Sequence, residues 1–133
     1  MPPGSPIPGS PQDWLRRAKS DLALARIPLP EGGFYEDLCF HAQQAAEKAL
    51  KAVYLYHGWT FRYVHDLEEL ITGLKRHGLT VPEAVEQCVA LTPYASETHY
   101  PGLSEPVTPE EYAEAVALAE RVVERAEGTI QKK

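Results

Sequence analysis

The chain has 133 residues, the usual size of one domain, and its 44% hydrophobic and 24% charged residues are typical of a globular protein. Its net charge of −6, from 13 basic and 19 acidic residues, argues against broad, sequence-independent DNA binding, because such binding depends on neutralising phosphates. No stretch approaches the roughly 18 apolar residues of a membrane span, and the N-terminus lacks a signal-peptide pattern, so we expect a cytoplasmic protein.

Residues 1–10 are rich in Pro, Gly and Ser, and we expect them to be disordered, followed by a single helical domain over residues 11–133. Ser10 as N-cap and Pro11 at the first helical position predict a helix that ends before Pro28.

A second helix is predicted from about Phe34 to His57, with Gly58 directly after its end. Apolar and mostly small residues recur along one face at helical spacing, as packing in a bundle requires: Leu38, Ala42, Ala45, Ala49, Val53 and Tyr56. The two cysteines, Cys39 and Cys88, lie in apolar patterns and form no C-x-x-C motif, so we expect reduced core residues.

The third predicted helix follows residues 65–66. Asp66 and Glu69 match a capping box, and Gly78 followed by Leu79 resembles a Schellman ending. Between them a regular apolar stripe indicates the buried face: Leu67, Leu70, Ile71 and Leu74.

A fourth helix is predicted to start near Thr80, with Thr80 as its cap and Glu83 as the reciprocal partner, and to end or kink at Pro93. The last helix is predicted to begin with a capping box of Thr108 and Glu111, and Gly128 closes it. No segment alternates with the period of a strand. The sequence therefore predicts an all-α fold, a five-helix up-and-down antiparallel bundle.

A polar stripe shares the second helix with the apolar face, at steps of three and four residues: His41, Gln44, Lys48 and Lys51. One interpretation is a solvated face, since Gln43, Glu47 and Lys51 would form an exposed ladder with a Glu–Lys pair. The alternative is a phosphate site, because Lys48 has no carboxylate three or four residues away on the same helix. Under that alternative we expect the stripe to line a groove or cleft.

Two further places carry candidate ligand-binding residues. His65 and Asp66 precede the third helix; Asp66 is explained as a cap, or else the helix N-terminus and His65 bind an anion. His99 and Tyr100 lie before a Pro-Gly turn in a loop that otherwise needs only polar residues; Tyr100 is alternatively a plug at the end of the bundle. No histidine pair has the spacing of a helical metal site, and we predict neither a metal nor a cofactor.

Three segments together resemble the HEPN domain family, named for higher eukaryotes and prokaryotes nucleotide-binding: FHAQQAAEKALKAVYLYHG, HDLEEL and TPYASETHYPG. The resemblance covers about Asp13 to Glu127. It implies a five-helix, mainly antiparallel bundle. It also implies a homodimer and a separate minimal nucleotidyltransferase as partner, in a toxin–antitoxin-like pair.

Two departures from the family pattern bear on function. Similar members have Arg-Tyr-Pro in the late loop, whereas His99 precedes Tyr100 here. The ribonuclease branch carries an Arg followed, after four to six residues, by a His; no Arg in this chain has a His at that distance. We therefore assign no catalytic residue and expect ribonuclease activity to be absent or very weak.

These observations favour a non-catalytic HEPN module that binds a nucleotide or another phosphate ligand, with the base stacked on Tyr54 or Tyr100. An alternative is a ribonuclease toxin with a degenerate site that uses His41, His65 or His99 as general acid or base. Another is a purely structural module, with the Ala-rich face of the second helix as the dimer seam. The twelve prolines, single methionine and absence of asparagine favour a heat-adapted source.

Overall fold

The computed structural model describes residues 6–95 and 106–131, and in these residues it contains helices but no strand. The elements are α1 (Pro11–Ala25), α2 (Tyr35–Tyr56), α3 (Leu67–Arg76), α4 (Glu83–Glu86), the 3₁₀ helix η1 (Gln87–Ala95) and α5 (Pro109–Ile130). The predicted all-α bundle of five α-helices is confirmed. Within the same residues, no helix combines the length and the apolar character that a membrane crossing requires.

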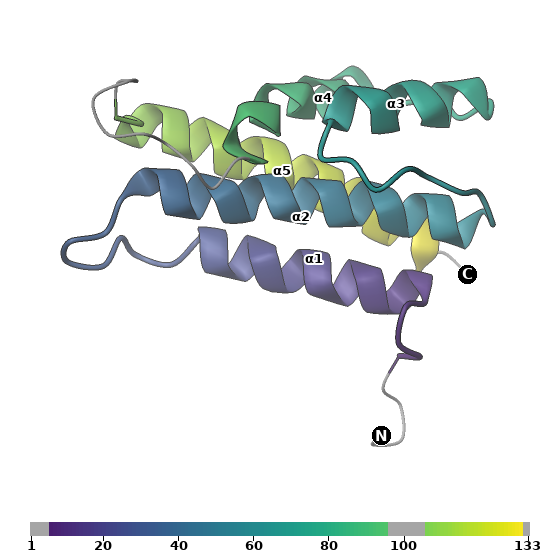
Figure 1. Cartoon of the computed structure of the whole chain (residues 1–133), viewed down its shortest axis with the longest axis horizontal. Helices are drawn as coiled ribbons and strands as arrows, with labels where there is room; N and C mark the ends of the chain where they lie inside the picture. The colour runs from purple at the N-terminus through teal and green to yellow at the C-terminus, as the bar shows by residue number, and fades with distance from the viewer. Residues whose placement is uncertain (1–5, 96–105, 132–133) are drawn as a thin grey trace.

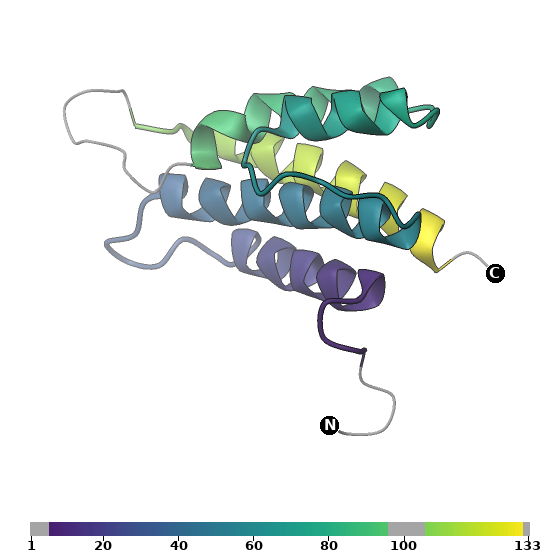
Figure 2. The same ribbon diagram turned by 45° about the vertical axis from the view of Figure 1, so that its right-hand side comes forward.

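The central element of the bundle is α2, which packs against α1, α3, α5 and η1 (Figure 1). Figure 2 shows α1 on one side of α2 and the layer of α3 and α4 on the other. The small residues of α2 allow this close packing, and they are completely buried within the single chain: Ala42, Ala45, Ala46, Ala49 and Ala52. The Ala-rich face is therefore part of the core and is not free to form a dimer seam, which corrects that interpretation.

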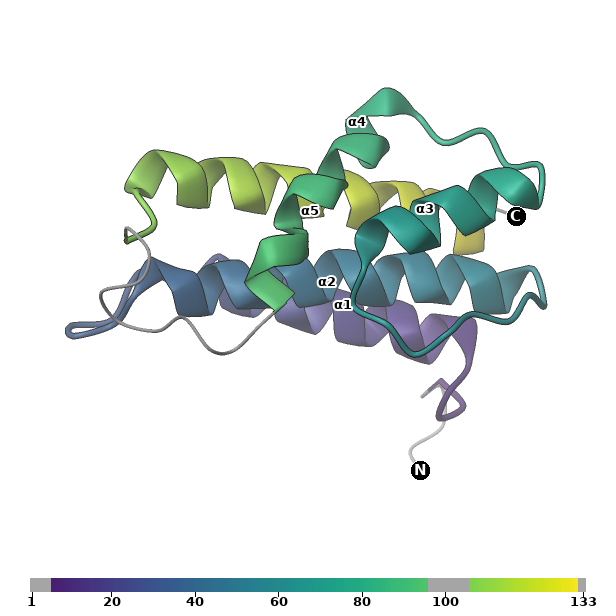
Figure 3. The same ribbon diagram turned by 45° about the horizontal axis from the view of Figure 1, so that its top comes forward.

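The connection between α2 and α3 does not simply reverse the chain into an antiparallel neighbour. Residues 57–66 run back along α2, and α3 then runs in the same direction as α2 (Figure 3). The contacts agree, because His65 lies beside Glu47 while Tyr54 donates a hydrogen bond to the carbonyl of Leu70. At roughly 3.3 Å per extended residue, this connection is long enough to return along most of α2.

Several predicted helix ends are confirmed. Ser10 caps α1 by accepting a hydrogen bond from the Asp13 N–H, and Thr108 with Glu111 forms the capping box of α5. Gly58 and Gly78 have φ of 76° and 91°, and the chain closes each preceding helix with Schellman hydrogen bonds. These turns require glycine, because a side chain is strained at positive φ.

Three details of the predicted ends are wrong. Asp66 caps α3 through the Glu68 N–H, but Glu69 does not reciprocate, since its carboxylate accepts a hydrogen bond from Arg62. α4 begins at Glu83 behind Pro82, without the predicted Thr80 cap, and the chain soon tightens into η1. α5 continues past Gly128 to Ile130.

Cys39 and Cys88 are buried, unpaired thiols, as predicted. Burial raises the pKa of Cys39 to about 11 and that of Cys88 to about 12.

Residues 6–10 form a turn that leads into the N-terminus of α1. Residues 1–5 lie outside the described part of the chain.

Candidate functional site

A buried carboxylate on α1 organises the first polar cluster. Asp21 accepts a hydrogen bond from Lys48 at 2.6 Å, and its other oxygen lies 3.1 Å from His41 Nδ1. The side chains of Lys48 and His41 are about one third exposed, whereas Asp21 is buried. Lys48 therefore has a carboxylate partner, on a neighbouring helix, and the expectation that it is unpaired is wrong.

A second cluster repeats this arrangement farther along α2. Glu47 accepts a hydrogen bond from Lys51 at 2.8 Å, and its other oxygen lies 2.8 Å from His65 Nδ1. Gln43 donates to the same carboxylate at 3.0 Å, and Gln44 donates to the side-chain amide oxygen of Gln43 at 2.7 Å. Each carboxylate thus contacts one lysine and one histidine, and the residues of the stripe are divided between two hydrogen-bonded clusters.

Glu47 and Lys51 are far more buried than a solvated ladder would be. Both side chains are only 5% exposed, and Gln43 is fully buried, so the exposed-ladder interpretation is wrong. The extended segment 57–66 covers this part of α2, and Lys51 Nζ lies 5.4 Å from the centre of the Phe61 ring. Aromatic faces attract a desolvated ammonium in this geometry, so Lys51 is held by both a carboxylate and a ring.

The hydrogen bonds to Glu47 decide its charge state. Burial alone would raise the pKa of Glu47, but hydrogen bonds from Lys51, Gln43 and His65 outweigh it, and the pKa is lowered. Glu47 is therefore ionised at neutral pH. A buried anion of this kind fixes the ring of His65 through Nδ1 although that side chain is 66% exposed.

The chemistry that this geometry permits is limited. In His41 and His65, the carboxylate engages Nδ1, and within the described residues no hydrogen bond reaches either Nε2. An imidazole held in this way can donate to an anion when protonated or accept a proton when neutral. Lys48 and Lys51 each form an ion pair with a carboxylate, so they do not form a phosphate site made of unpaired lysines.

The other residues predicted to bind a ligand, where the structure describes them, belong to neither cluster. Asp66 is occupied as the cap of α3, and the N–H of Leu67 donates to Thr92, so this helix end already has partners. His99 and Tyr100 lie outside the described residues. Tyr54 is buried, with its hydroxyl bonded to Leu70, and is not available to stack on a base.

Sequence reasoning missed the two carboxylates as the centres of the clusters. Asp21 shares the buried face of α1 with Ala18, Leu22 and Ala25. A charged residue at helical spacing among apolar ones was the sequence signal that could have identified it. Glu47 was identified only as a surface partner of Lys51. Its burial depends on the path of residues 57–66, which no periodicity in the sequence reveals.

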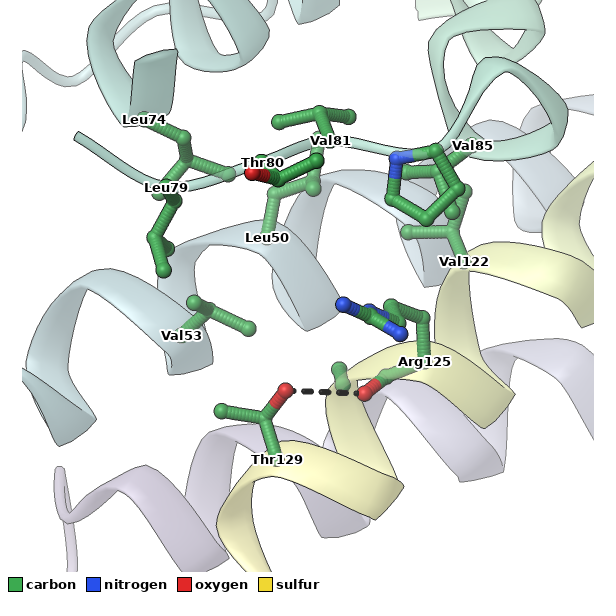
Figure 4. Close-up of a pocket in the computed structure, with 12 residues that line it drawn as sticks. Leu50, Val53, Leu74, Leu79, Thr80, Val81, Val85, Val122, Arg125 and Thr129 are labelled. Carbon is green, nitrogen blue, oxygen red and sulfur yellow. Dashed lines mark hydrogen bonds between the residues drawn. The ribbon is translucent and has the colours of Figure 1, made fainter. Parts of the chain in front are cut away.

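Three cavities in the described part of the bundle lie away from the polar stripe. One cavity, of about 50 Å³, lies between α2, α5 and the residues that precede α4. Figure 4 shows Leu50, Val53 and Val122 among its apolar walls, with Arg125 and Thr129 beside them. Of the predicted site residues that the structure describes, none lines it or either of two larger cavities. Over residues 6–95 and 106–131, no three His, Cys, Asp or Glu side chains converge as ligands of a metal ion would.

Comparison with known proteins relates this fold to a family. Residues 11–129 match the model of the HEPN domain. The crystal structure of TT1696 from Thermus thermophilus is 32% identical, with a TM-score of 0.72, and the match covers 88% of this chain and 95% of that chain. The crystal structure of ST0689, an archaeal HEPN homologue, is 29% identical, with a TM-score of 0.69 and coverage of 91% and 98%.

One curated relative matches over a shorter segment. The Methanocaldococcus jannaschii protein named "Putative toxin MJ1304" is 41% identical over 49 residues. This segment is 37% of the present chain and 32% of that protein, so the chain spans about a third of the length of this relative.

Proposed function

The chain belongs to the HEPN domain family, and we propose that it is a non-catalytic member that binds a nucleotide or another phosphate-containing ligand and acts with a separate nucleotidyltransferase. One observation carries the proposal: the exposed ring of His65 is fixed by the buried carboxylate of Glu47. The fold alone does not need an oriented imidazole at the surface, whereas recognition of an anion does.

The proposed ligand-facing groups are the exposed members of the two clusters. His65 offers Nε2 from the Glu47 cluster, to which Gln44 is joined through Gln43, and His41 with Lys48 offers further polar groups from the Asp21 cluster. Lys51 acts indirectly, by holding Glu47. We propose that His99 and Tyr100 complete the site from the loop before α5, and that Asp66 positions His65 by capping α3.

The proposed homodimer needs a surface other than the alanines of α2, because these residues are fully buried in the monomer. Exposed apolar side chains near the turn between α1 and α2 are available for it: Leu24, Ile27 and Phe34. Light scattering of the purified protein tests this proposal; a single species with the mass of one chain over a wide concentration range would reject it.

A second candidate function is RNA cleavage. Two histidines oriented by carboxylates are what general acid–base catalysis requires, and a relative is named as a toxin. Cleavage also requires a group that stabilises the charge developing on the phosphate, and no Arg stands four to six residues before a His. We therefore rank this candidate second.

Calorimetric titration with inorganic phosphate and with a nucleoside triphosphate tests the lead proposal. We expect His65→Ala to weaken binding of both at least tenfold, and Lys48→Gln to weaken it less. Lys19→Gln, which removes an exposed lysine of α1 that pairs with Glu127, serves as the control. Equal binding by the parent and His65→Ala would reject the site. Degradation of a labelled RNA by the parent, lost in His41→Ala, would establish the second candidate instead.

A further inference from the structure

The cavity in Figure 4 is lined by apolar side chains of α2, α3 and α5 and by the connection between α3 and α4. Leu50, Leu74 and Val122 are among its buried walls, whereas Thr80 and Arg125 are exposed and mark the side that faces solvent. Water finds few hydrogen-bond partners between apolar walls, and apolar cavities stay dry or take up apolar ligands. The cavity therefore favours an aliphatic group over water.

The volume of the cavity limits that group to a short chain. Its volume of about 50 Å³ is far below the roughly 300–1000 Å³ of sites that hold drug-sized ligands. One water molecule needs about 10–15 Å³ of such space, so the cavity has room for about three to five atoms of similar size. A methylene group is close to a water molecule in size, so an unbranched alkyl chain of that length fits.

The polar residue that distinguishes this cavity is Arg125. Figure 4 shows its side chain reaching from α5 toward α2. Over residues 6–95 and 106–131, no carboxylate pairs with its guanidinium group, whereas Arg26 of α1 pairs with Glu120 of the same α5. None of the residues three or four positions from Arg125 on this helix is acidic: Arg121, Val122, Gly128 and Thr129. An arginine without a carboxylate partner therefore lies on the wall of an apolar cavity.

We propose that this cavity binds a short-chain monocarboxylate, a straight-chain acid of about four to six carbon atoms. Its alkyl chain occupies the space between Leu50, Val53 and Val122, and Arg125 holds its carboxylate with two charge-assisted hydrogen bonds. Thr80, which lines the same cavity, offers a hydroxyl group as a further donor.

Other small ligands match these features less well. A neutral alcohol of the same length fills the cavity but leaves the arginine without a counter-charge, and an inorganic phosphate has no aliphatic part to place between the apolar walls. No residue of the Asp21 cluster or the Glu47 cluster lines the cavity, so this site is separate from the proposed phosphate site.

Titration of isotopically labelled protein with sodium salts of straight-chain acids, followed by nuclear magnetic resonance at constant ionic strength, tests the size of the site. Each methylene group removed from water strengthens binding about fourfold, so pentanoate, with three more methylene groups than acetate, should bind about sixtyfold more tightly. Octanoate should gain nothing further, because its chain is longer than the cavity. Pentanol should bind at least about tenfold more weakly than pentanoate, since it carries no charge for Arg125 to pair with.

Variants test the two parts of the site separately. Arg125→Gln should weaken pentanoate binding at least about tenfold and remove the preference over pentanol. Arg121→Gln, one turn earlier on α5 and outside the cavity, is the matched control and should bind like the parent. Ala126→Val narrows the cavity from the α5 wall and should weaken pentanoate more than acetate. A thermal melt of each variant verifies the fold, and if Ala126→Val does not fold, the chain-length series and Arg125→Gln decide.

Four results would overturn the proposal. They are the absence of pentanoate binding by the parent, an affinity that does not rise from acetate to pentanoate, equal binding of pentanol, or equal binding of pentanoate by the parent and Arg125→Gln. His65→Ala separates the two proposed sites, since we expect it to lose phosphate binding and to retain pentanoate. Loss of both ligands together in His65→Ala would mean that the acid binds at the phosphate site and that the cavity is not a site of its own.

Discussion

Glu47 and Lys51, one turn apart on α2, form an ion pair of 2.8 Å in which both side chains are only 5% exposed. Most pairs at this spacing lie on helix surfaces and contribute little to stability. This pair is enclosed by Gln43, by the exposed ring of His65 and by the aromatic side chains of residues 57–66. The burial of the ion pair therefore depends on the position of the segment between α2 and α3.

We predict that Glu47→Gln lowers the free energy of unfolding by about 3–5 kcal/mol, because it leaves the Lys51 ammonium buried without a counter-charge. Urea denaturation at pH 7 measures this change. The double variant Glu47→Gln/Lys51→Met should recover much of the loss, since it removes the second charge and keeps the volume. A single variant as stable as the parent would mean that the pair is solvated in solution.

We predict that Gly73→Ala destabilises the protein by about 1–2 kcal/mol, although alanine favours helix by up to about 1 kcal/mol. The added methyl group meets the hydroxyl of Tyr54, which is fixed by its hydrogen bond to Leu70. Gly128→Ala in α5 is the control, because nothing lies within 4 Å of its Cβ, and it should be neutral or slightly stabilising. Tyr54→Phe should reduce the cost of Gly73→Ala.

Acid should destabilise the protein through two carboxylates. Hydrogen bonds from Arg16 and the Gly9 N–H, with a further one from Arg17, lower the pKa of Asp13 from 3.8 to about 2. The pKa of Glu47 is also lowered. Since each folded pKa lies below the unfolded one, this stability is fully present above about pH 5 and is lost as the pH falls toward 2. Denaturation from pH 7 to pH 2.5 should show the decline, and Asp13→Asn should flatten it.

The two thiols should be unreactive in the native protein. Burial raises the pKa of Cys39 to about 11, helped by Glu36 and Glu111, and that of Cys88 to about 12, so almost no thiolate exists at pH 8. An aromatic disulfide reagent should label neither residue in buffer and both in concentrated urea. Rapid labelling of one thiol without denaturant would mean that its region opens locally.

The sequence was informative where the governing interactions are local. Ser10, Thr108, Gly58 and Gly78 act within a few residues of themselves, so their caps and turns could be predicted from neighbouring letters. The departures arise from packing at a distance. Glu69 leaves its predicted capping role because Arg62, on the preceding segment, binds its carboxylate.

The candidate site was predicted less well, because its pairings join residues far apart in the chain. Lys48 and Asp21 are separated by 27 positions, and Glu47 and His65 by 18. Helical periodicity places each side chain on a face of its own helix, but it does not specify which helix or segment covers that face. The stripe was therefore found, while the carboxylates that neutralise it were not.

The final prediction compares two lysines of that stripe one turn apart. Lys48→Ala should cost about 1 kcal/mol or less, because its side chain is 29% exposed and Asp21 keeps its contact with His41. Lys51→Ala should cost about 3 kcal/mol or more, because Glu47 then loses its counter-charge in a buried position. Urea denaturation of both variants measures the loss in the free energy of unfolding. An equal loss in the two variants would mean that the two lysines are equally exposed in solution. The difference also decides how binding data are interpreted: lost ligand binding in Lys51→Ala reports on folding, whereas lost binding in the stable Lys48→Ala variant reports on the ligand site itself.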